Sequence, residues 1–471
     1  TDTAERYTVT VLHRQQAQID EPTTVGFQFA DGDDFPVRVP VVPQGGQYFA
    51  PGDSPGANYR VEPLPDHRVR VTVELPEKPV QVAVDPDQVL EDVDPANNYW
   101  KPRERWRWTP LYTQLEEADL MNDYDRWNFI VGPWVYASAT RDPWFQRPSY
   151  AGLRAGAFRT QQYDGGVYAA LRSDYRDLVI GVDGLIDHWP LPKTQIGYVV
   201  EQRVAGPIGP NGPDSVFRAV LYGRYVLQYT SALYMNPMQY VEVFGTYQQN
   251  PLPFARHDEP GAERPDRIAA GGLHYHIDYT TPYWDPEAGF RFDATYTGGE
   301  TQLQNRGDVP LHKFESQLTY VTTPPAGYGY LSDTRLAVRG SVAGALPDEG
   351  EHFALGGATL FRGFDLAERQ GSFLWVGNVE WRLPVLRRVC WDAADHVVGL
   401  RNVWVAPFYD VGEIYANGHS VDGVAHALGV GLRADVAWFS FIERSMLRLD
   451  LAKTLNAASP WQVWVGVQHA F

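Results

Sequence analysis

The chain has 471 residues with a formal net charge of -18, 13% aromatic residues and one cysteine, Cys390. No apolar run approaches the roughly 18 residues that a membrane helix needs, which excludes a helical membrane protein but leaves a closed barrel open. The negative charge argues against nucleic acid as a partner, because such binding relies on basic side chains. One cysteine forms no intrachain disulfide, so we expect a free thiol. Thr1 opens the chain without a signal peptide, and we expect further residues upstream.

Residues 1–92 contain short alternating runs such as "RYTVTVLH" and "HRVRVTVEL", with the hairpin turn signal "ADGDD" between two of them. This spacing predicts a small antiparallel β-sandwich. The aspartates of the turn, Asp31, Asp33 and Asp34, carry the oxygen ligands that a calcium site uses, but turn chemistry is the better explanation of them. We favour the turn and predict no metal and no cofactor.

The end of this region, "VQVAVDPDQVLEDVDPANN", resembles the end of the immunoglobulin-like sandwich in zinc peptidases of the aminopeptidase N type. The residues that carry the resemblance are Asp85, Pro86, Asp87, Asn97 and Asn98. It implies a sandwich that joins a peptidase portion to the remainder of the chain. The chain has no H-E-x-x-H motif and no phosphate loop, so we expect it not to be an enzyme and place any peptidase domain upstream of residue 1.

Residues 93–126 change to proline, asparagine, aromatic and charged residues, which predicts a linker with at most one short helix around "LYTQLEEADL". Within it, arginines alternate with tryptophans at Arg103, Arg105, Trp106, Arg107 and Trp108. Such interleaving suits a membrane interface or a nucleic-acid groove, and the total charge favours the membrane.

From residue 127 to 471 the polarity alternates over about ten residues at a time, with turns or polar loops between. In "LRLDLA" the leucines share one face while Arg448 and Asp450 share the other. A soluble antiparallel sheet also alternates, but charges of both signs on the polar face are typical of a wet barrel lumen. We therefore predict an all-β chain with a sixteen-stranded antiparallel transmembrane barrel. Its strands are expected to begin near residues 127, 149, 165, 177, 195, 216, 236, 266, 287, 309, 334, 373, 399, 425, 444 and 461.

The last stretch, "WQVWVGVQHAF", resembles the C-terminal recognition signal of bacterial outer-membrane barrels. The residues on its signal face are Trp461, Val463, Val465, Val467, His469 and Phe471. The resemblance implies an outer-membrane location with the N-terminal region in the periplasm. The implied partners are outer-membrane lipid, lipopolysaccharide and the barrel assembly machinery.

The long connection "FALGGATLFRGFDLAERQGS" resembles the inner loop of the BamA/TamA superfamily of sixteen-stranded outer-membrane barrels, which carries a V/I/L-R-G-F/Y motif. Phe361, Arg362, Gly363 and Phe364 match it, with phenylalanine in place of the aliphatic residue. The resemblance implies that the loop folds back into the lumen and that its arginine meets an aspartate of an F-x-D-x-G motif. The matching wall residues are Phe408, Asp410 and Gly412 in "FYDVG" and Glu380 in "NVEWRLP".

These residue types suit a loop that has no core to hold it, because a guanidinium paired bidentately with a carboxylate supplies direction as well as energy. We expect Gly363 to permit a sharp turn and the flanking Phe361 and Phe364 to cover the ion pair. The alternative is that Arg362 is an ordinary surface charge.

The first barrel strand, "WNFIVGPWVYAS", holds Gly132 and Pro133 in its middle, and proline removes a donor from the ladder. Closure pairs this strand with the last one, which contains Gly466. We expect a weak seam there, which the family uses as a lateral opening; a local bulge without function is the alternative. Elsewhere, His274, His276 and Asp278 in "HYHID" share one strand face and suit a metal ion or a lumen lining, and we favour the lining.

Taken together, the sequence favours the noncatalytic membrane anchor or translocation part of a larger metallopeptidase-like protein. The alternatives are an insertase or secretion transporter that binds polypeptide substrates through the sandwich, and a passive solute pore.

Overall fold

The computed structural model describes the following residues: 6–15, 21–32, 34–42, 58–92, 94–108, 124–137, 149–172, 177–204, 216–230, 237–251, 263, 265–280, 286–325, 329–393, 398–438, 444–457 and 459–467. Over these residues the fold is all-β, as predicted, and its helical elements are the 3-10 turns η1 (Pro95–Asn98) and η2 (Gly329–Asp333). None of the described helices has the length and apolar character required to cross a membrane.

The N-terminal unit consists of two antiparallel sheets around one core. One sheet has the order β1-β5-β4 and the other β3-β2-β6-β7. Val25 and Phe27 from one sheet meet Val71 and Val73 from the other, and all four side chains are fully buried. The strands are β1 (Tyr7–Arg14), β2 (Thr23–Gln28), β3 (Val37–Val41), β4 (Tyr59–Leu64), β5 (Arg68–Leu75), β6 (Gln81–Val84) and β7 (Tyr99–Trp100).

The predicted linker at 93–126 is divided between the two parts of the chain. β7 pairs with β6, so this stretch belongs to the N-terminal unit and extends it beyond residue 92. β8 (Arg103–Trp108) instead joins the barrel. The predicted short helix around residues 111–120 lies outside the described residues.

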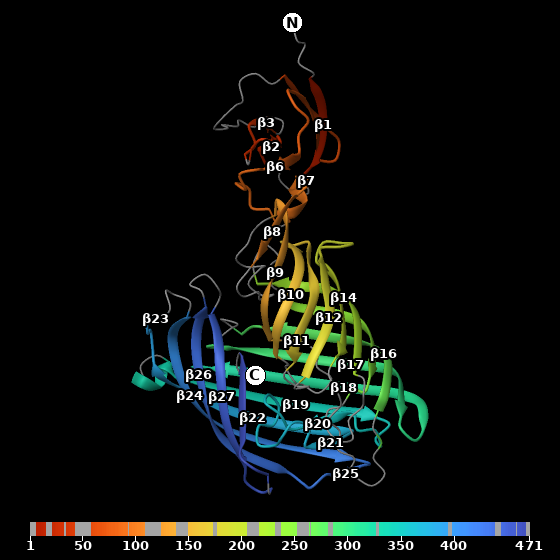
Figure 1. The fold of residues 1–471 in the computed structure, drawn as a ribbon, viewed down its shortest axis with the longest axis vertical. Coiled ribbons are helices and arrows are strands. Elements are labelled where there is room, and N and C mark those ends of the chain that lie inside the picture. The colour runs from red at the N-terminus through yellow and green to blue at the C-terminus, as the bar shows by residue number, and fades with distance from the viewer. Residues whose placement is uncertain are drawn as a thin grey trace.

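The barrel is one sheet that closes on itself, in the order β10 to β19, β22 to β28, β8 and β9. Figure 1 shows it below the N-terminal unit, along the long axis of the molecule. Its strands are β8, β9 (Arg126–Ala137), β10 (Ser149–Arg159), β11 (Tyr163–Arg172), β12 (Asp177–Asp187), β13 (Thr194–Arg203), β14 (Phe217–Tyr229), β15 (Pro237–Gln249), β16 (Pro265–Asp278), β17 (Gly289–Leu303), β18 (Gly307–Thr322), β19 (Arg335–Leu346), β22 (Phe373–Leu386), β23 (Trp391–Ala393), β24 (Val398–Ala416), β25 (His419–Ser420), β26 (Ala425–Trp438), β27 (Arg444–Thr454) and β28 (Gln462–Val467).

A strand begins within two residues of each predicted start, but the count of sixteen is not confirmed, because three further strands join the closed order. Two of them, β23 and β25, are short extensions that pair with β24. The third, β8, lies between the last strand and the first and runs parallel to β9. Its alternation of arginine and tryptophan was too short to be distinguished from a linker.

Alternation places apolar side chains on the outer face and charged side chains on the inner face. Large exposed apolar residues recur around the barrel: Leu153, Val167, Ile180, Leu221, Val243, Leu273, Tyr320, Leu428, Leu449 and Val465. Buried charged residues of both signs recur on the opposite face: Arg154, Arg172, Glu201, Glu242, Arg339, Glu380, Asp410, Arg433, Asp435 and Asp450. The outer face is therefore the one that suits lipid.

Side chains at the rim join the N-terminal unit to the barrel. Arg159 Nη2, at the end of β10, donates to the carbonyl oxygen of Ala96 at 2.7 Å. Arg103 Nη2, at the start of β8, donates to the carbonyl oxygen of Gly32 at 2.6 Å. Both acceptors lie beside the β3-β2-β6-β7 sheet, since Gly32 follows β2 and Ala96 precedes β7.

Candidate functional site

The connection between β19 and β22 lies inside the barrel and is buried over most of its length. Its two short strands, β20 (Phe353–Leu355) and β21 (Arg369–Gly371), pair with each other. The loop side chains Leu360, Phe361 and Phe364 are fully buried in an apolar cluster that also contains wall residues of β19, β22, β24 and β26. The expectation that this loop has no core is wrong, since apolar packing and ion pairing hold it together.

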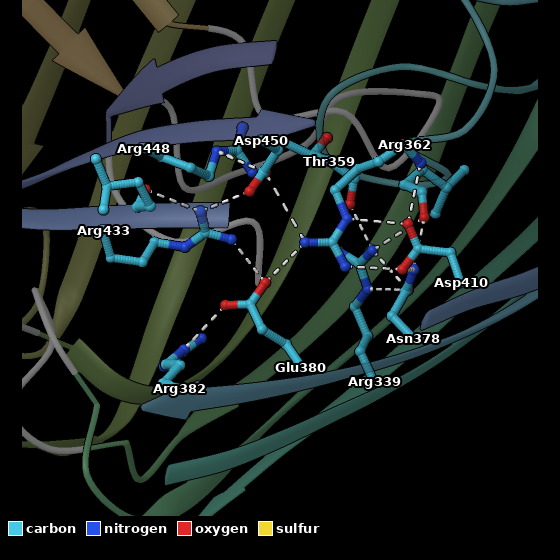
Figure 2. Close-up of polar contacts among 12 residues, drawn as sticks. Arg339, Thr359, Arg362, Asn378, Glu380, Arg382, Asp410, Arg433, Arg448 and Asp450 are labelled. Atoms are coloured by element: carbon cyan, nitrogen blue, oxygen red, sulfur yellow. Dashed lines mark hydrogen bonds and ion pairs between the residues drawn. The ribbon is translucent and has the colours of Figure 1, made fainter. Parts of the chain in front are cut away.

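Arg362 makes a bidentate contact with Asp410 of β24: its Nε donates to Oδ2 at 2.9 Å and its Nη2 to Oδ1 at 2.8 Å. Its backbone N–H donates to the same carboxylate at 3.0 Å. Nη1 donates to Oε2 of Glu380 on β22 at 2.7 Å. Figure 2 shows the guanidinium directed at both carboxylates. We call Arg362, Asp410 and Glu380 the loop lock.

The loop lock is shielded from water. The side chain of Arg362 is 1% exposed and those of both carboxylates are 0% exposed. Phe408 covers the guanidinium, whose central carbon lies 3.3 Å from the centre of the ring. The arginine is charged at any physiological pH, because a guanidinium group stays protonated in proteins.

The roles expected for the flanking phenylalanines need correction. Phe361 and Phe364 pack against each other, with ring centres 4.6 Å apart, and belong to the apolar cluster of the loop. The ring over the guanidinium is instead Phe408, from the wall.

Gly363 is needed for close approach and has no positive φ that would mark a sharp turn. A Cβ at this position would lie 2.5 Å from the Cβ of Ala427.

A second set of polar contacts fixes the loop backbone. Asn378 Nδ2 donates to Asp410 Oδ1 at 2.8 Å and to the carbonyl oxygen of Leu360 at 2.9 Å. Arg339 donates to Asn378 Oδ1 and to the carbonyl oxygens of Thr359 and Leu360. Backbone atoms preceding residue 361 are thus bound to the wall as well.

Glu380 connects the loop lock to the strands beyond it. Its Oε2 also accepts from Arg433 Nη2 of β26 at 2.8 Å, and its Oε1 accepts from Arg382 Nε at 3.1 Å. Arg433 Nη1 in turn donates to Asp450 Oδ1 of β27 at 2.5 Å. The alternation had placed Asp450 on the polar face, but no spacing in the sequence indicated that it would meet this network.

The network also reaches the last strand. Trp464 Nε1 of β28 donates to the carbonyl oxygen of Arg362 at 2.9 Å. Gly466, one of the seam residues expected from the sequence, lies opposite Arg448, and a Cβ there would come 2.9 Å from that guanidinium. Gly412, from the F-x-D-x-G match, is likewise packed closely, because a Cβ on it would lie 3.1 Å from the Val376 side chain. The loop and the last strand are therefore directly connected.

The first-strand side of the seam differs from the expectation, because β9 does not pair with the last strand: β8 lies between β28 and β9. β9 pairs with β10 over its length, with Pro133 opposite Leu153 and no register shift, so no bulge occurs on that side. Towards the seam, β8 pairs with β9 from Arg126 to Val131, and Gly132 and Pro133 follow directly. The proline therefore lies just beyond the point where this parallel pairing ends. Whether the seam opens stays a prediction.

β8 presents two different faces. Trp106 and Trp108 are 70% and 67% exposed on the outer face, and the Trp106 ring stacks on Phe129 with centres 4.4 Å apart. On the inner face, Arg105 Nε and Nη2 both donate to Asn128 Oδ1, at 3.0 and 2.8 Å. The tryptophans thus continue the apolar outer face across the seam.

The C-terminal signal is visible in part. Trp461, Val463 and Val465 are 62%, 62% and 75% exposed and share the outer face. The Val467 side chain, His469 and Phe471 lie outside the part of the chain that the structure describes.

Cys390 is an exposed free thiol, as expected.

The possible metal ligands are arranged differently from the sequence pattern. Asp34, one of the candidate calcium ligands, accepts from the backbone N–H of Phe35 at 2.7 Å and from Arg38 Nη2 at 3.1 Å, which gives it a turn-forming role. In the "HYHID" strand, Asp278 Oδ1 accepts from the backbone and hydroxyl of Thr280, at 2.8 and 2.6 Å. Asp278 is thereby turned to its own strand end and does not join the two histidines.

The chain matches no protein-family profile and no curated protein sequence. Among solved structures it is similar to BamA from Haemophilus ducreyi lacking POTRA domains 1-3, with 10% sequence identity, 88% of each chain covered and a TM-score of 0.43. It is also similar to CdiB from Acinetobacter baumannii, with 11% identity, 78% of this chain and 73% of that chain covered, and a TM-score of 0.37. Both TM-scores are low, so a function for this chain has to rest on its own geometry.

Proposed function

We propose that this chain is a bacterial outer-membrane β-barrel that moves polypeptides across the membrane or inserts them into it, with its N-terminal unit in the periplasm. The membrane part of the proposal is supported by the outer face, where large apolar side chains are exposed on strand after strand. Exposure of such an apolar surface to water is unfavourable in free energy, whereas lipid and lipopolysaccharide would cover it. The barrel assembly machinery is the partner we expect during biogenesis.

The observation that carries the transport function is the loop fastened inside the lumen beside the seam. A passive pore needs an open lumen, whereas here buried ion pairs attach the loop to β22 and β24. Trp464 attaches the same loop to the strand at the seam. The loop is thus bound both to the wall and to β28. A polypeptide that displaces the loop would therefore also loosen the strand at the seam, as transport through the barrel requires.

Single-channel recording in planar bilayers tests the plug. The wild type should conduct little, and Arg362→Ala should show larger and more frequent openings because the loop loses its main attachment. Arg267→Ala is the matched control, since Arg267 forms an exposed ion pair with Asp308 on the same barrel. High wild-type conductance that the substitution leaves unchanged would favour the passive pore.

A disulfide between β8 and β9 tests whether the barrel has to open at this junction in order to work. In a Cys390→Ser background, Trp106→Cys and Phe129→Cys introduce thiols at directly opposed positions of β8 and β9. Oxidation should stop insertion or export of a polypeptide substrate in proteoliposomes, and a reductant should restore it. Leu153→Cys with Ala169→Cys, opposed on β10 and β11, is the control pair in the permanent wall. Full activity of the oxidised pair would exclude an opening between β8 and β9 as part of the function.

The role of membrane anchor for a metallopeptidase-like portion remains the other interpretation of the sequence. Among the described residues, no contact or cavity favours it over transport. The N-terminal unit serves equally well as the surface that receives an unfolded polypeptide.

A further inference from the structure

Two adjacent barrel strands bring three potential metal ligands together at one point of the lumen wall. His274 and His276 lie two residues apart on β16, and Asp293 of β17 is the direct cross-strand partner of His276. The ligand atoms of the three side chains all lie within 4.8 Å of one another. Leu273 is 53% exposed on the outer face, so the alternating histidines face the lumen.

One oxygen of Asp293 faces both imidazoles. Oδ1 lies 3.2 Å from His274 Nε2 and 2.7 Å from His276 Nδ1. The other oxygen, Oδ2, makes only a long ion-pair contact with Arg291 Nε, at 3.9 Å. Oδ1 is therefore the oxygen of Asp293 that is placed to act as a ligand together with the two imidazoles.

The two imidazole rings are held by an aromatic neighbour. Tyr240 of β15 stacks on His276, with ring centres 4.7 Å apart, and meets His274 edge-on at 5.7 Å. Their orientation therefore does not depend on the hydrogen bonds to Asp293 alone. His276 and Asp293 keep 14% and 29% of their side-chain surface exposed, so water from the lumen can reach the same point.

We propose that His274, His276 and Asp293 bind one divalent transition-metal ion of the Zn²⁺ or Co²⁺ type, with lumen water completing its coordination. Two imidazole nitrogens and one carboxylate oxygen are ligands that such ions prefer, whereas Ca²⁺ and Mg²⁺ take oxygen ligands. Metal-ligand bonds of about 2.0–2.1 Å place two tetrahedral ligands roughly 3.3 Å apart. His274 Nε2 already lies close to that separation from Asp293 Oδ1, at 3.2 Å, whereas His276 Nδ1, at 2.7 Å, has to move away from this oxygen when the ion enters.

Such an ion would join β16 to β17 in the lumen wall, and this inference does not depend on the proposed transport function. It differs from the sequence analysis in two ways: a lumen lining was favoured there, and the carboxylate grouped with the two histidines was Asp278, whereas here it is Asp293. Without an ion, the same three residues form a hydrogen-bonded lumen lining, and an experiment separates the two.

The test uses the full chain, folded in detergent, carrying no polyhistidine tag and freed of metal by a chelator. Titration with Co²⁺ should give the visible absorption bands of a tetrahedral ion, saturating at one Co²⁺ per chain, and Zn²⁺ should abolish them. Asp293→Asn and His276→Ala should each weaken binding at least about tenfold. Migration of unheated samples on gels shows that each variant is folded.

His426→Ala is the matched control, since His426 also lies on a barrel strand and contacts a tyrosine, Tyr409, at 2.6 Å. Its Co²⁺ titration should equal that of the wild type. If wild-type protein takes up no stoichiometric Co²⁺, or if folded Asp293→Asn binds it as tightly, these residues are a lumen lining only and the proposed site is refuted.

Discussion

Replacement of Arg362 by alanine is the sharpest test of the loop lock. The change removes the bidentate contact with Asp410 and the single contact with Glu380. Glu380 keeps Arg433 and Arg382 as partners, so its charge stays compensated. Asp410 is left with the side chain of Asn378 and one backbone N–H.

Removal of one partner from a buried ion pair costs about 3–5 kcal/mol, because the remaining charge is isolated from water. Two donors still reach Asp410, so we expect the lower end of that range, about 3 kcal/mol. The double variant Arg362→Ala with Asp410→Ala should be less destabilised than the sum of the single variants, because no lone charge remains.

The measurement is the temperature at which the protein in detergent loses its folded migration on unheated gels, together with the denaturant midpoint. Arg362→Ala should lower both clearly, whereas the exposed control Arg267→Ala should leave both close to wild type. Equal behaviour of the two variants would mean that the buried contacts do not hold the loop, and the loop lock would be refuted.

Three further predictions concern single residues. Trp464→Phe removes the indole N–H that donates to the carbonyl oxygen of Arg362 and should cost about 1 kcal/mol by the same denaturant assay; no loss would mean that the last strand is not attached to the loop. Gly363→Ala places a methyl group 2.5 Å from Ala427 and should cost about 1–3 kcal/mol, and full stability would show that the loop packs less closely than described. Cys390 is exposed and should react with a maleimide in the folded protein as fast as in denaturant, so slow labelling would contradict its position.

The barrel could be predicted largely because its strands leave a local pattern, and alternation with a period of two located them. The partners of the loop lock were implied by the resemblance of "FRGF", "FYDVG" and "NVEWRLP" to the motifs of a known family, and the structure brings these residues together. Arg339, Asn378 and Trp464 escaped prediction because each acts on a loop backbone atom. A side chain that binds a carbonyl oxygen leaves no complementary residue type to find in the sequence.

Two other features could not be predicted, for a different reason: the carboxylate that faces the two histidines and the place of β8 in the barrel. Asp278 shares a strand with the two histidines, but Asp293 of the next strand faces them, and cross-strand register cannot be derived from one strand alone. β8 has only six residues, and its partners lie at opposite ends of the barrel sequence. Pairing between strands that lie so far apart in the sequence forms only when the barrel closes.

The position of β8 has a mechanical consequence. Only Lys101 and Pro102 separate it from β7, whose pairing with β6 fixes it in the N-terminal unit. A tilt of that unit would be transmitted over two residues to the closing edge of the cylinder. Because the parallel ladder with β9 covers only Arg126 to Val131, force applied through the N-terminal unit would separate β8 from β9 one residue pair at a time.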